Sequence, residues 1–277
     1  MQHIEDTFEA NDGLKLYYQA WIPENPKAIV QIIHGYAEHS SRYGFVVEKL
    51  LANGYAVFAH DNRGHGKSEG LRGYVNKFEE FVDDAYKFTK LIQEKHPDFP
   101  IFLLGHSMGS QIAQYVIALY PDVYKGLVLS GTGIRPGDTN PIVAFFGKIF
   151  SRLFPKMKFP TGLSRDFISS DPEVVNAYKN DPNVFIETIT ARLGAEMLSY
   201  YKRIKQKLAD VNTPVLIQKG KLDTSLVGED ILFSDLGTND KTLLLYDNAL
   251  HEIYNEVKEI REKALQDLVE WLDKHLS

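Results

Sequence analysis

Cysteine is missing from all 277 residues of the chain. Its absence excludes disulfide bonds, thiolate nucleophiles and cysteine-ligated metal sites. Long clusters of lysine and arginine are missing too, and the formal net charge is −6, so we expect no nucleic-acid partner. The pattern H-E-x-x-H does not occur, and the histidines are dispersed, so we expect no metal site.

Segments that would place the chain in or across a membrane are also missing. No apolar run approaches the roughly 18 residues that a membrane-spanning helix needs. The first residues, MQHIEDTFEANDG, are polar and acidic, unlike the basic and then apolar start of a secretory signal. We therefore expect a soluble cytoplasmic protein.

Short apolar runs alternate with amphipathic segments along most of the chain. Ala28–Gly35 and Ile101–Ser107 are mostly apolar, which is typical of strands buried on both faces. Residues 78–97 have helical spacing and end at a proline. The alternation predicts an α/β fold with a mostly parallel central sheet and helices on both faces.

This alternation stops after Gly133 and resumes after Asp210. Residues 134–210 contain helical stretches but no strand pattern, and the segment is too long for an ordinary loop. We predict an α/β core formed by residues 1–133 and 211–277. Residues 134–210 are predicted to form a helical cap inserted into that core.

The stretch FLLGHSMGSQIA contains a serine at the point where a predicted strand becomes a helix. Gly105-His106-Ser107-Met108-Gly109 fits the pattern G-x-S-x-G in the strand–turn–helix context that this pattern requires. A tight turn exposes the serine oxygen at the carboxyl edge of the sheet, where a neighbouring base can activate it. A glycine-bounded turn that merely contains a serine is the alternative, and it predicts no catalytic partners downstream.

Partners do follow, in the chain order of serine, acid and histidine that this elbow requires. Asp223 comes after the predicted strand TPVLIQKG, and His251 comes after KTLLLYDN. Asp230 and Asp235 fall in a predicted helix, and Asp247 is too close to His251 to be an independent acid. We predict a triad of Ser107, Asp223 and His251.

An oxyanion hole needs two backbone N–H donors beside the serine. The residue after the serine supplies the first, at Met108. The turn after the early strand VQIIHG supplies the second, which we assign to Tyr36. We expect His106 to point elsewhere, although it neighbours the serine in sequence.

The segment DNRGHGKSEG contains three glycines but fits neither the Walker pattern nor G-x-G-x-x-G. We interpret it as a structural turn near the site. Only side chains and backbone amides are needed for the predicted chemistry, so we expect no cofactor.

With these residues in view, the chain resembles the monoacylglycerol lipase and lysophospholipase branch of the α/β-hydrolase superfamily. The resemblance spans nearly the whole chain in order. It is carried by the stretches HGYAEHSSRY, FAHDNRGHGKSEG, FLLGHSMGS, LSRDFISSDPEVVNAYKNDP and NALHEIYNE.

The resemblance implies an α/β-hydrolase fold with a cap over the site, and it supports the same triad and oxyanion donors. It also implies that Glu38 and Arg42 form a polar pair near the catalytic floor. Tyr178 resembles a cap residue that faces the polar end of the substrate. Two positions depart from the family pattern: Ser110 stands where a glycine is common, and Thr224 where a basic residue is frequent.

We therefore predict a serine ester hydrolase for lipids with one acyl chain, with monoacylglycerol as the first substrate. A lysophospholipase or a general carboxylesterase is the nearest alternative. An aminopeptidase of the proline-iminopeptidase type shares the fold and triad, and a non-catalytic ligand-binding scaffold is the alternative from another class.

Residues 140–160 form a basic amphipathic segment at the start of the predicted cap. Basic amphipathic helices often lie at membrane surfaces. We hypothesise that this face contacts both the acyl chain and lipid aggregates, and a face buried in the core is the alternative. Its apolar residues are Ile142, Phe145, Phe146, Ile149, Phe150, Leu153 and Phe154, and its basic residues are Lys148, Arg152, Lys156 and Lys158.

Overall fold

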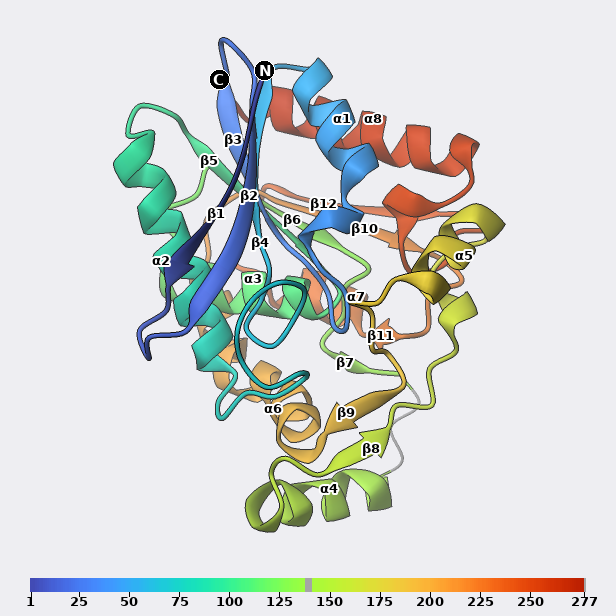
Figure 1. The fold of residues 1–277 in the computed structure, drawn as a ribbon. Coiled ribbons are helices and arrows are strands. Elements are labelled where there is room, and N and C mark those ends of the chain that lie inside the picture. Colours follow the sequence, from blue (N-terminus) through green and yellow to red (C-terminus); the bar gives the residue numbers. More distant parts are fainter. Residues whose placement is uncertain (138–140, 277) are drawn as a thin grey trace.

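An eight-stranded sheet lies at the centre of the molecule (Figure 1). The computed structural model describes residues 1–137 and 141–276, without the side chains of residues 141–146. The strand order is β1-β2-β4-β3-β5-β6-β10-β12. The pairs β1–β2 and β2–β4 are antiparallel, and all other pairs in this sheet are parallel, so the sheet is mostly parallel, as predicted. The strands are β1 (Gln2–Glu9), β2 (Lys15–Ile22), β3 (Ala28–Ile33), β4 (Tyr55–His60), β5 (Ile101–His106), β6 (Gly126–Ser130), β10 (Val215–Gly220) and β12 (Lys241–Tyr246).

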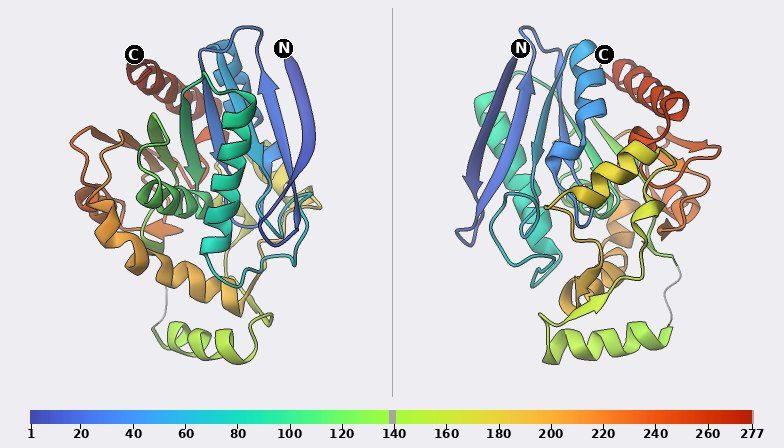
Figure 2. Two further views of the ribbon diagram at one scale, coloured as in Figure 1. Left: turned by 90° about the vertical axis from the view of Figure 1, so that its left-hand side faces the viewer. Right: turned by 45° about the vertical axis from the view of Figure 1, so that its right-hand side comes forward.

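Helices cover both faces of this sheet (Figure 2). Alternate side chains of β3 point to opposite faces, so Val30 and Ile32 join one hydrophobic core and Ile29 and Ile33 join the other. The first core also contains α1 (Gly44–Ala52) and α8 (Lys258–Lys274). The second contains α2 (Glu79–Lys95) and α3 (Met108–Leu119). This burial on both faces explains why the central strands are almost wholly apolar.

Most of the segment between β6 and β10 lies at the end of the molecule remote from both termini, whereas its helix α5 lies near α8 (Figure 1). Its helix α6 packs between α3 and α4, and the buried side chains of α6 belong to the same core as α2 and α3. The elements are β7 (Arg135–Pro136), α4 (Pro141–Leu153), β8 (Lys158–Pro160), η2 (Arg165–Phe167), α5 (Pro172–Asn180), β9 (Thr188–Thr190) and α6 (Ala191–Leu208).

The expectation that this segment contains no strand is wrong. β8 pairs with β9, and β7 pairs with β11 (Leu226–Val227) from the chain beyond β10. Strands of two or three residues show no alternation, so a sequence pattern cannot reveal them. The remaining elements are η1 (Ser40–Arg42), α7 (Glu229–Asp235) and η3 (Ile253–Asn255).

None of the helices in the described ranges is both long enough and apolar enough to cross a bilayer.

Candidate active site

Ser107 occupies a one-residue turn between β5 and α3. Its φ of 53° and ψ of −122° lie outside the regions that ordinary residues prefer, so the turn is strained. Gly109 permits the close approach of α3 to β3, because a Cβ there would lie 2.1 Å from the carbonyl oxygen of Ile33. The conformation of this turn is therefore the one that the sequence pattern predicts, with Ser107 at its tip.

Asp223 and His251 lie in the loops that follow β10 and β12, two adjacent parallel strands. His251 Nδ1 is 2.9 Å from Asp223 Oδ2, and these side chains are 4% and 1% exposed. Burial disfavours the imidazolium, but the Asp223 carboxylate, together with the carboxylates of Glu252 and Glu38, raises the pKa of His251. Burial also opposes ionisation of Asp223, yet His251 holds the pKa of this carboxyl well below its usual range.

The end of β6 brings Ser107 and His251 to the same place. The Ser107 amide donates a hydrogen bond of 3.0 Å to the Ser130 carbonyl. At the next residue, Gly131, a Cβ would lie 3.1 Å from His251 Cε1. No hydrogen bond joins Ser107 Oγ to His251 among the described residues, although such bonds are often long before substrate binds. Asp247 lies apart, because it is exposed and paired with Lys221 at 2.7 Å.

The predicted oxyanion donors flank the serine. The turn after β3 lies against Ser107, since a Cβ on Gly35 would be 3.0 Å from Ser107 Cβ. Glu38 Oε1 accepts the Gly35 amide at 2.6 Å and so fixes this turn. Met108 is the first residue of α3. In the described part of the chain, the amides of Tyr36 and Met108 have no hydrogen-bond acceptor.

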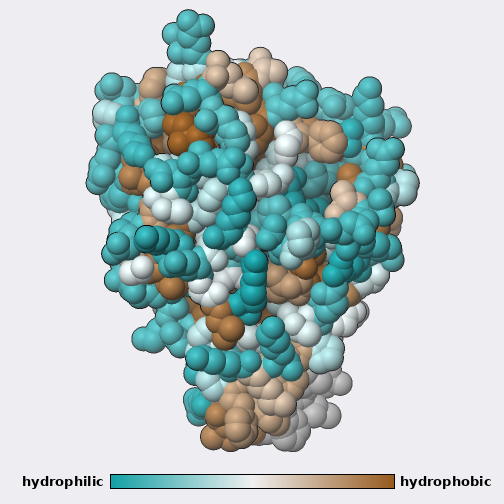
Figure 3. Space-filling view, viewed as in Figure 1, coloured by the Kyte–Doolittle hydropathy of each residue, from teal (hydrophilic) through white to brown (hydrophobic). Residues whose placement is uncertain are grey.

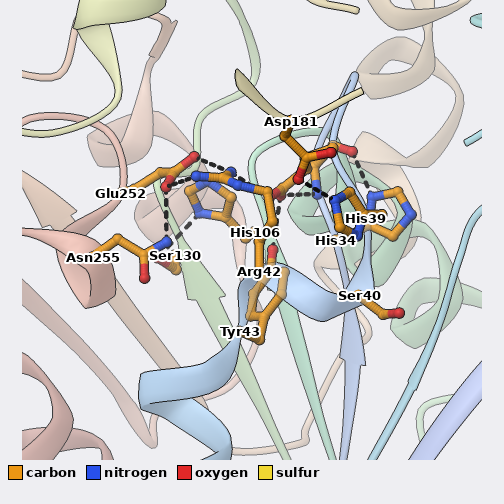
Figure 4. A network of polar contacts seen from close by, with 12 residues as sticks. His34, His39, Ser40, Arg42, Tyr43, His106, Ser130, Asp181, Glu252 and Asn255 are labelled. Atoms are coloured by element: carbon orange, nitrogen blue, oxygen red, sulfur yellow. Dashed lines mark hydrogen bonds and ion pairs between the residues drawn. The ribbon is translucent and has the colours of Figure 1, made fainter. Parts of the chain in front are cut away.

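Arg42 is the centre of a buried ion-pair network that includes Glu252, the residue after His251 (Figure 4). Its guanidinium donates to Glu38 at 2.8 Å and to both carboxylate oxygens of Glu252 at 2.6 and 2.8 Å. The Tyr178 ring of α5 lies 4.5 Å from the guanidinium carbon. The structure thus gathers Glu38, Arg42 and Tyr178, and it adds Glu252, which the sequence analysis did not identify although it follows His251 directly.

A cavity of about 10 Å³ lies at this network, large enough for one water molecule. Its wall combines the ion-pair network with neighbouring polar and aromatic side chains. The lining residues are Glu38, Arg42, Tyr43, His106, Ser130, Glu252, Tyr254 and Asn255.

His106 also belongs to the site, whereas we expected it to point elsewhere. Its ring centroid is 4.8 Å from that of His251, and its Nδ1 is 3.3 Å from Ser130 Oγ. Burial, together with the nearby His251, lowers the pKa of His106 to about 4. His106 is therefore neutral at pH 7 and adds no positive charge beside His251.

Two further neighbours of His251 were missed. Phe167 of η2 lies over the imidazole with ring centroids 5.2 Å apart. Ser225 contacts both Asp223 and His251 from the loop after β10. No sequence pattern indicates that either residue contacts His251, because both contacts depend on the packing of separate loops. Within the described ranges, no group of three or more histidines, aspartates or glutamates is arranged to hold a metal ion.

Known proteins match the chain over nearly its whole length. A family model, Hydrolase_4, described as serine aminopeptidase S33, matches residues 24–258. The monoacylglycerol lipase of Mycolicibacterium smegmatis is 33% identical over 276 residues, which cover 98% of each chain.

Solved structures agree with this match. The crystal structure of the Paleococcus ferrophilus monoacylglycerol lipase superimposes with a TM-score of 0.84 at 31% identity, covering 94% of this chain and 99% of that one. A soluble variant of the Saccharomyces cerevisiae monoglyceride lipase, in complex with a substrate analog, gives 0.86 at 25% identity over 100% and 96% of the two chains. The chain therefore belongs to the serine aminopeptidase S33 family of α/β hydrolases, in the branch that contains these monoacylglycerol lipases.

Proposed function

We propose that the chain hydrolyses esters of single-chain lipids, and monoacylglycerol first, through an acyl-enzyme on Ser107. The observation that carries the proposal is the buried Asp223–His251 pair beside a strained serine elbow. The names of the relatives support the substrate class.

In this mechanism, His251 Nε2 takes the proton of Ser107 Oγ as the oxygen attacks the ester carbonyl. Asp223 keeps the imidazole oriented and stabilises the imidazolium. The amides of Tyr36 and Met108 then donate to the oxyanion, and loss of one such donor typically costs about 3 kcal/mol in the transition state. His251 returns the proton to the leaving alcohol, and water cleaves the acyl-enzyme by the same route.

The polar network supports a small polar alcohol as leaving group. Glu38, Arg42 and Glu252 provide charged acceptors and donors next to His251, where the alcohol departs. Tyr178 places a phenol from the cap over the same network. A glycerol group suits this environment better than a second acyl chain does.

A hydrolysis panel tests the proposal. We expect turnover of monoacylglycerols to exceed that of triacylglycerols, lysophospholipids and a soluble p-nitrophenyl ester, with no turnover of a proline amide. Faster hydrolysis of the lysophospholipid than of monoacylglycerols would show that the protein is a lysophospholipase instead. Hydrolysis of the proline amide alone would support the aminopeptidase alternative and overturn the ester hydrolase.

We also propose that the outer face of α4 and the chain after it contact an anionic lipid surface. Leu153 is 67% exposed and Phe154 is 56% exposed, and apolar side chains gather at this end of the molecule (Figure 3). Lys148, Arg152 and Lys156 are exposed nearby and supply positive charge. Phe150 is only half-buried, between Phe154 and Phe159, whereas Ile142, Phe145 and Phe146 lie outside the described side chains.

Vesicle binding tests this contact. The double variant Leu153→Ser/Phe154→Ser should lose binding to anionic vesicles and hydrolyse vesicle-bound monoacylglycerol more slowly, while turnover of a soluble short-chain ester stays unchanged. The control is Leu71→Ser, which removes an equally apolar side chain that is 45% exposed elsewhere. Unchanged vesicle binding in the double variant would contradict the contact.

A further inference from the structure

Ser225 lies two residues after Asp223 in the loop between β10 and β11, and its side chain reaches the acid–histidine pair. Its amide donates to Asp223 Oδ1 at 2.9 Å, and its hydroxyl donates to the same oxygen. Ser225 Oγ is also 2.7 Å from His251 Nδ1. This nitrogen is therefore close to two oxygens, because Asp223 Oδ2 is 2.9 Å away.

The number of protons on these groups determines which atom donates and which accepts in each hydrogen bond. A serine hydroxyl has one proton, and Asp223 Oδ1 receives it. Only lone pairs of Oγ then remain to face His251 Nδ1, so this nitrogen must carry its own proton. Nδ1–H consequently points between Oγ and Oδ2, and both oxygens accept from it.

We propose that Ser225 is a positioning residue that forms a two-residue acceptor with Asp223 for the Nδ1–H of His251. The inference rests on the proposed function, because it assigns the way in which the catalytic base is held. The amide and hydroxyl of Ser225 occupy Oδ1, so Oδ2 stays directed at the imidazole. With Nδ1 protonated and bound on two sides, Nε2 is left unprotonated toward Ser107.

A serine that only shaped this loop would not need the contact with His251. The amide–carboxylate bond already closes the turn at residues 223–225. The hydroxyl contributes the additional bond to a residue 26 positions away in the chain. The amide of Ser225 therefore closes the turn, and its hydroxyl contacts His251. A substitution that removes only the hydroxyl tests the second of these roles.

Loss of the hydroxyl should slow the chemical step without weakening substrate binding. Ser225 contacts Nδ1, whereas the substrate meets the histidine on the Nε2 side. We expect Ser225→Ala to lower kcat about tenfold, as for the loss of one hydrogen bond to a group that becomes charged, with KM within twofold. Ser225→Thr, which keeps a hydroxyl, should restore most of kcat.

Thr224→Ala is the matched control, because it removes an exposed hydroxyl from the adjacent position of the same loop. We expect its kcat to equal that of the wild type. If a second variant is needed to preserve the shape of the side chain, Ser225→Cys replaces the hydroxyl with a weak acceptor and should behave like Ser225→Ala.

The proton on His251 Nδ1 gives a readout that needs no turnover. Its NMR resonance in the resting protein should move in Ser225→Ala and stay in place in Thr224→Ala. In Asp223→Asn, Ser225 still accepts Nδ1–H, so the double variant Asp223→Asn/Ser225→Ala should lose activity beyond the single Asp223→Asn variant.

Two results would overturn the assignment: an unmoved resonance in Ser225→Ala, or equal kcat values for Ser225→Ala and Thr224→Ala in an enzyme that hydrolyses esters. A wild-type protein that hydrolyses no ester would instead contradict the proposed function. The resonance would still decide the role of Ser225 in that case.

Discussion

Ser107 combines a strained backbone with a small side chain outside the hydrophobic cores. Its hydroxyl contributes no described hydrogen bond to the fold, so its removal should leave the fold intact. The cost of the strained turn lies in the backbone and is independent of the hydroxyl.

We therefore predict that Ser107→Ala lowers ester hydrolysis by about 10⁴-fold or more, as expected for a lost nucleophile. Its free energy of unfolding should stay within about 0.5 kcal/mol of the wild type. Turnover assays, urea titration and labelling by a fluorophosphonate check these outcomes. A Ser107→Ala protein that still hydrolyses esters or takes up the label would show that another residue is the nucleophile.

His251 must be neutral to accept the proton of Ser107, so its pKa sets the acid side of the pH profile. The Asp223 carboxylate raises that pKa against the opposing effect of burial. The acid limb of kcat/KM should consequently have its midpoint above the roughly 6.5 of a free imidazole. Asp223→Asn should shift this midpoint to lower pH, because it removes the negative charge. A wild-type midpoint below 6.5 would contradict the charge assignment.

At the scale of elements, the elbow depends on close contact between α3 and β3. A Cβ on Gly109 would lie 2.1 Å from the Ile33 oxygen and 2.5 Å from the His34 oxygen. These are backbone atoms at the middle of the sheet, so β3 cannot move away without disturbing its hydrogen bonds to β4 and β5.

Gly109→Ala should therefore destabilise the fold by about 1–3 kcal/mol, the usual cost of overpacking a core. Gly147 in α4 is the control, because a Cβ there would meet nothing within 4 Å. Gly147→Ala should be neutral or stabilising by up to about 1 kcal/mol through helix propensity. Thermal melting of both variants checks the prediction, and equal melting temperatures would contradict it.

The same scale shows what the sequence can predict. The central strands are buried on both faces, so apolar composition identified β3 and β5. The residues of β1 show no strand pattern of their own because it is an edge strand with mostly exposed polar residues, and only Phe8 among its residues is buried. Its position depends on pairing with β2, which is not a property of its own residues.

The residues of the candidate site also differ in whether the sequence can predict them. Ser107, Asp223 and His251 could be proposed from the sequence because each follows a recognisable strand, and the carboxyl ends of parallel strands meet at one edge. Glu252 and Ser225 could not, since their contacts depend on side-chain rotamers and on the approach of loops. The boundaries at residues 133 and 211 remain a prediction of the sequence pattern.

At the scale of the whole molecule, Arg42 connects three distant parts of the chain. It binds Glu38 in its own loop and Glu252 in the loop after β12, and it contacts Tyr178 in α5. His39 adds a second link to the same region through Asp181 at 2.8 Å (Figure 4). The segment around α5 is thus attached to the loops after β3 and β12 by polar contacts beside the candidate active site.

Replacing Arg42 by methionine should therefore destabilise the whole molecule. The side chains of Glu38 and Glu252 are only 5% and 6% exposed, so the change would leave two buried carboxylates without their shared cation. Removal of one partner from a buried ion pair typically costs about 3–5 kcal/mol, which exceeds the lost attraction of an exposed pair several times. Lys221→Met is the control, because its pair with Asp247 is 48% and 77% exposed and should be worth less than about 1 kcal/mol. Urea titration measures both changes in the free energy of unfolding. If the two variants lost equal stability, the Arg42 network would contribute no more than a surface pair, and the segment between β6 and β10 would be held mainly by the packing of α6 against α3.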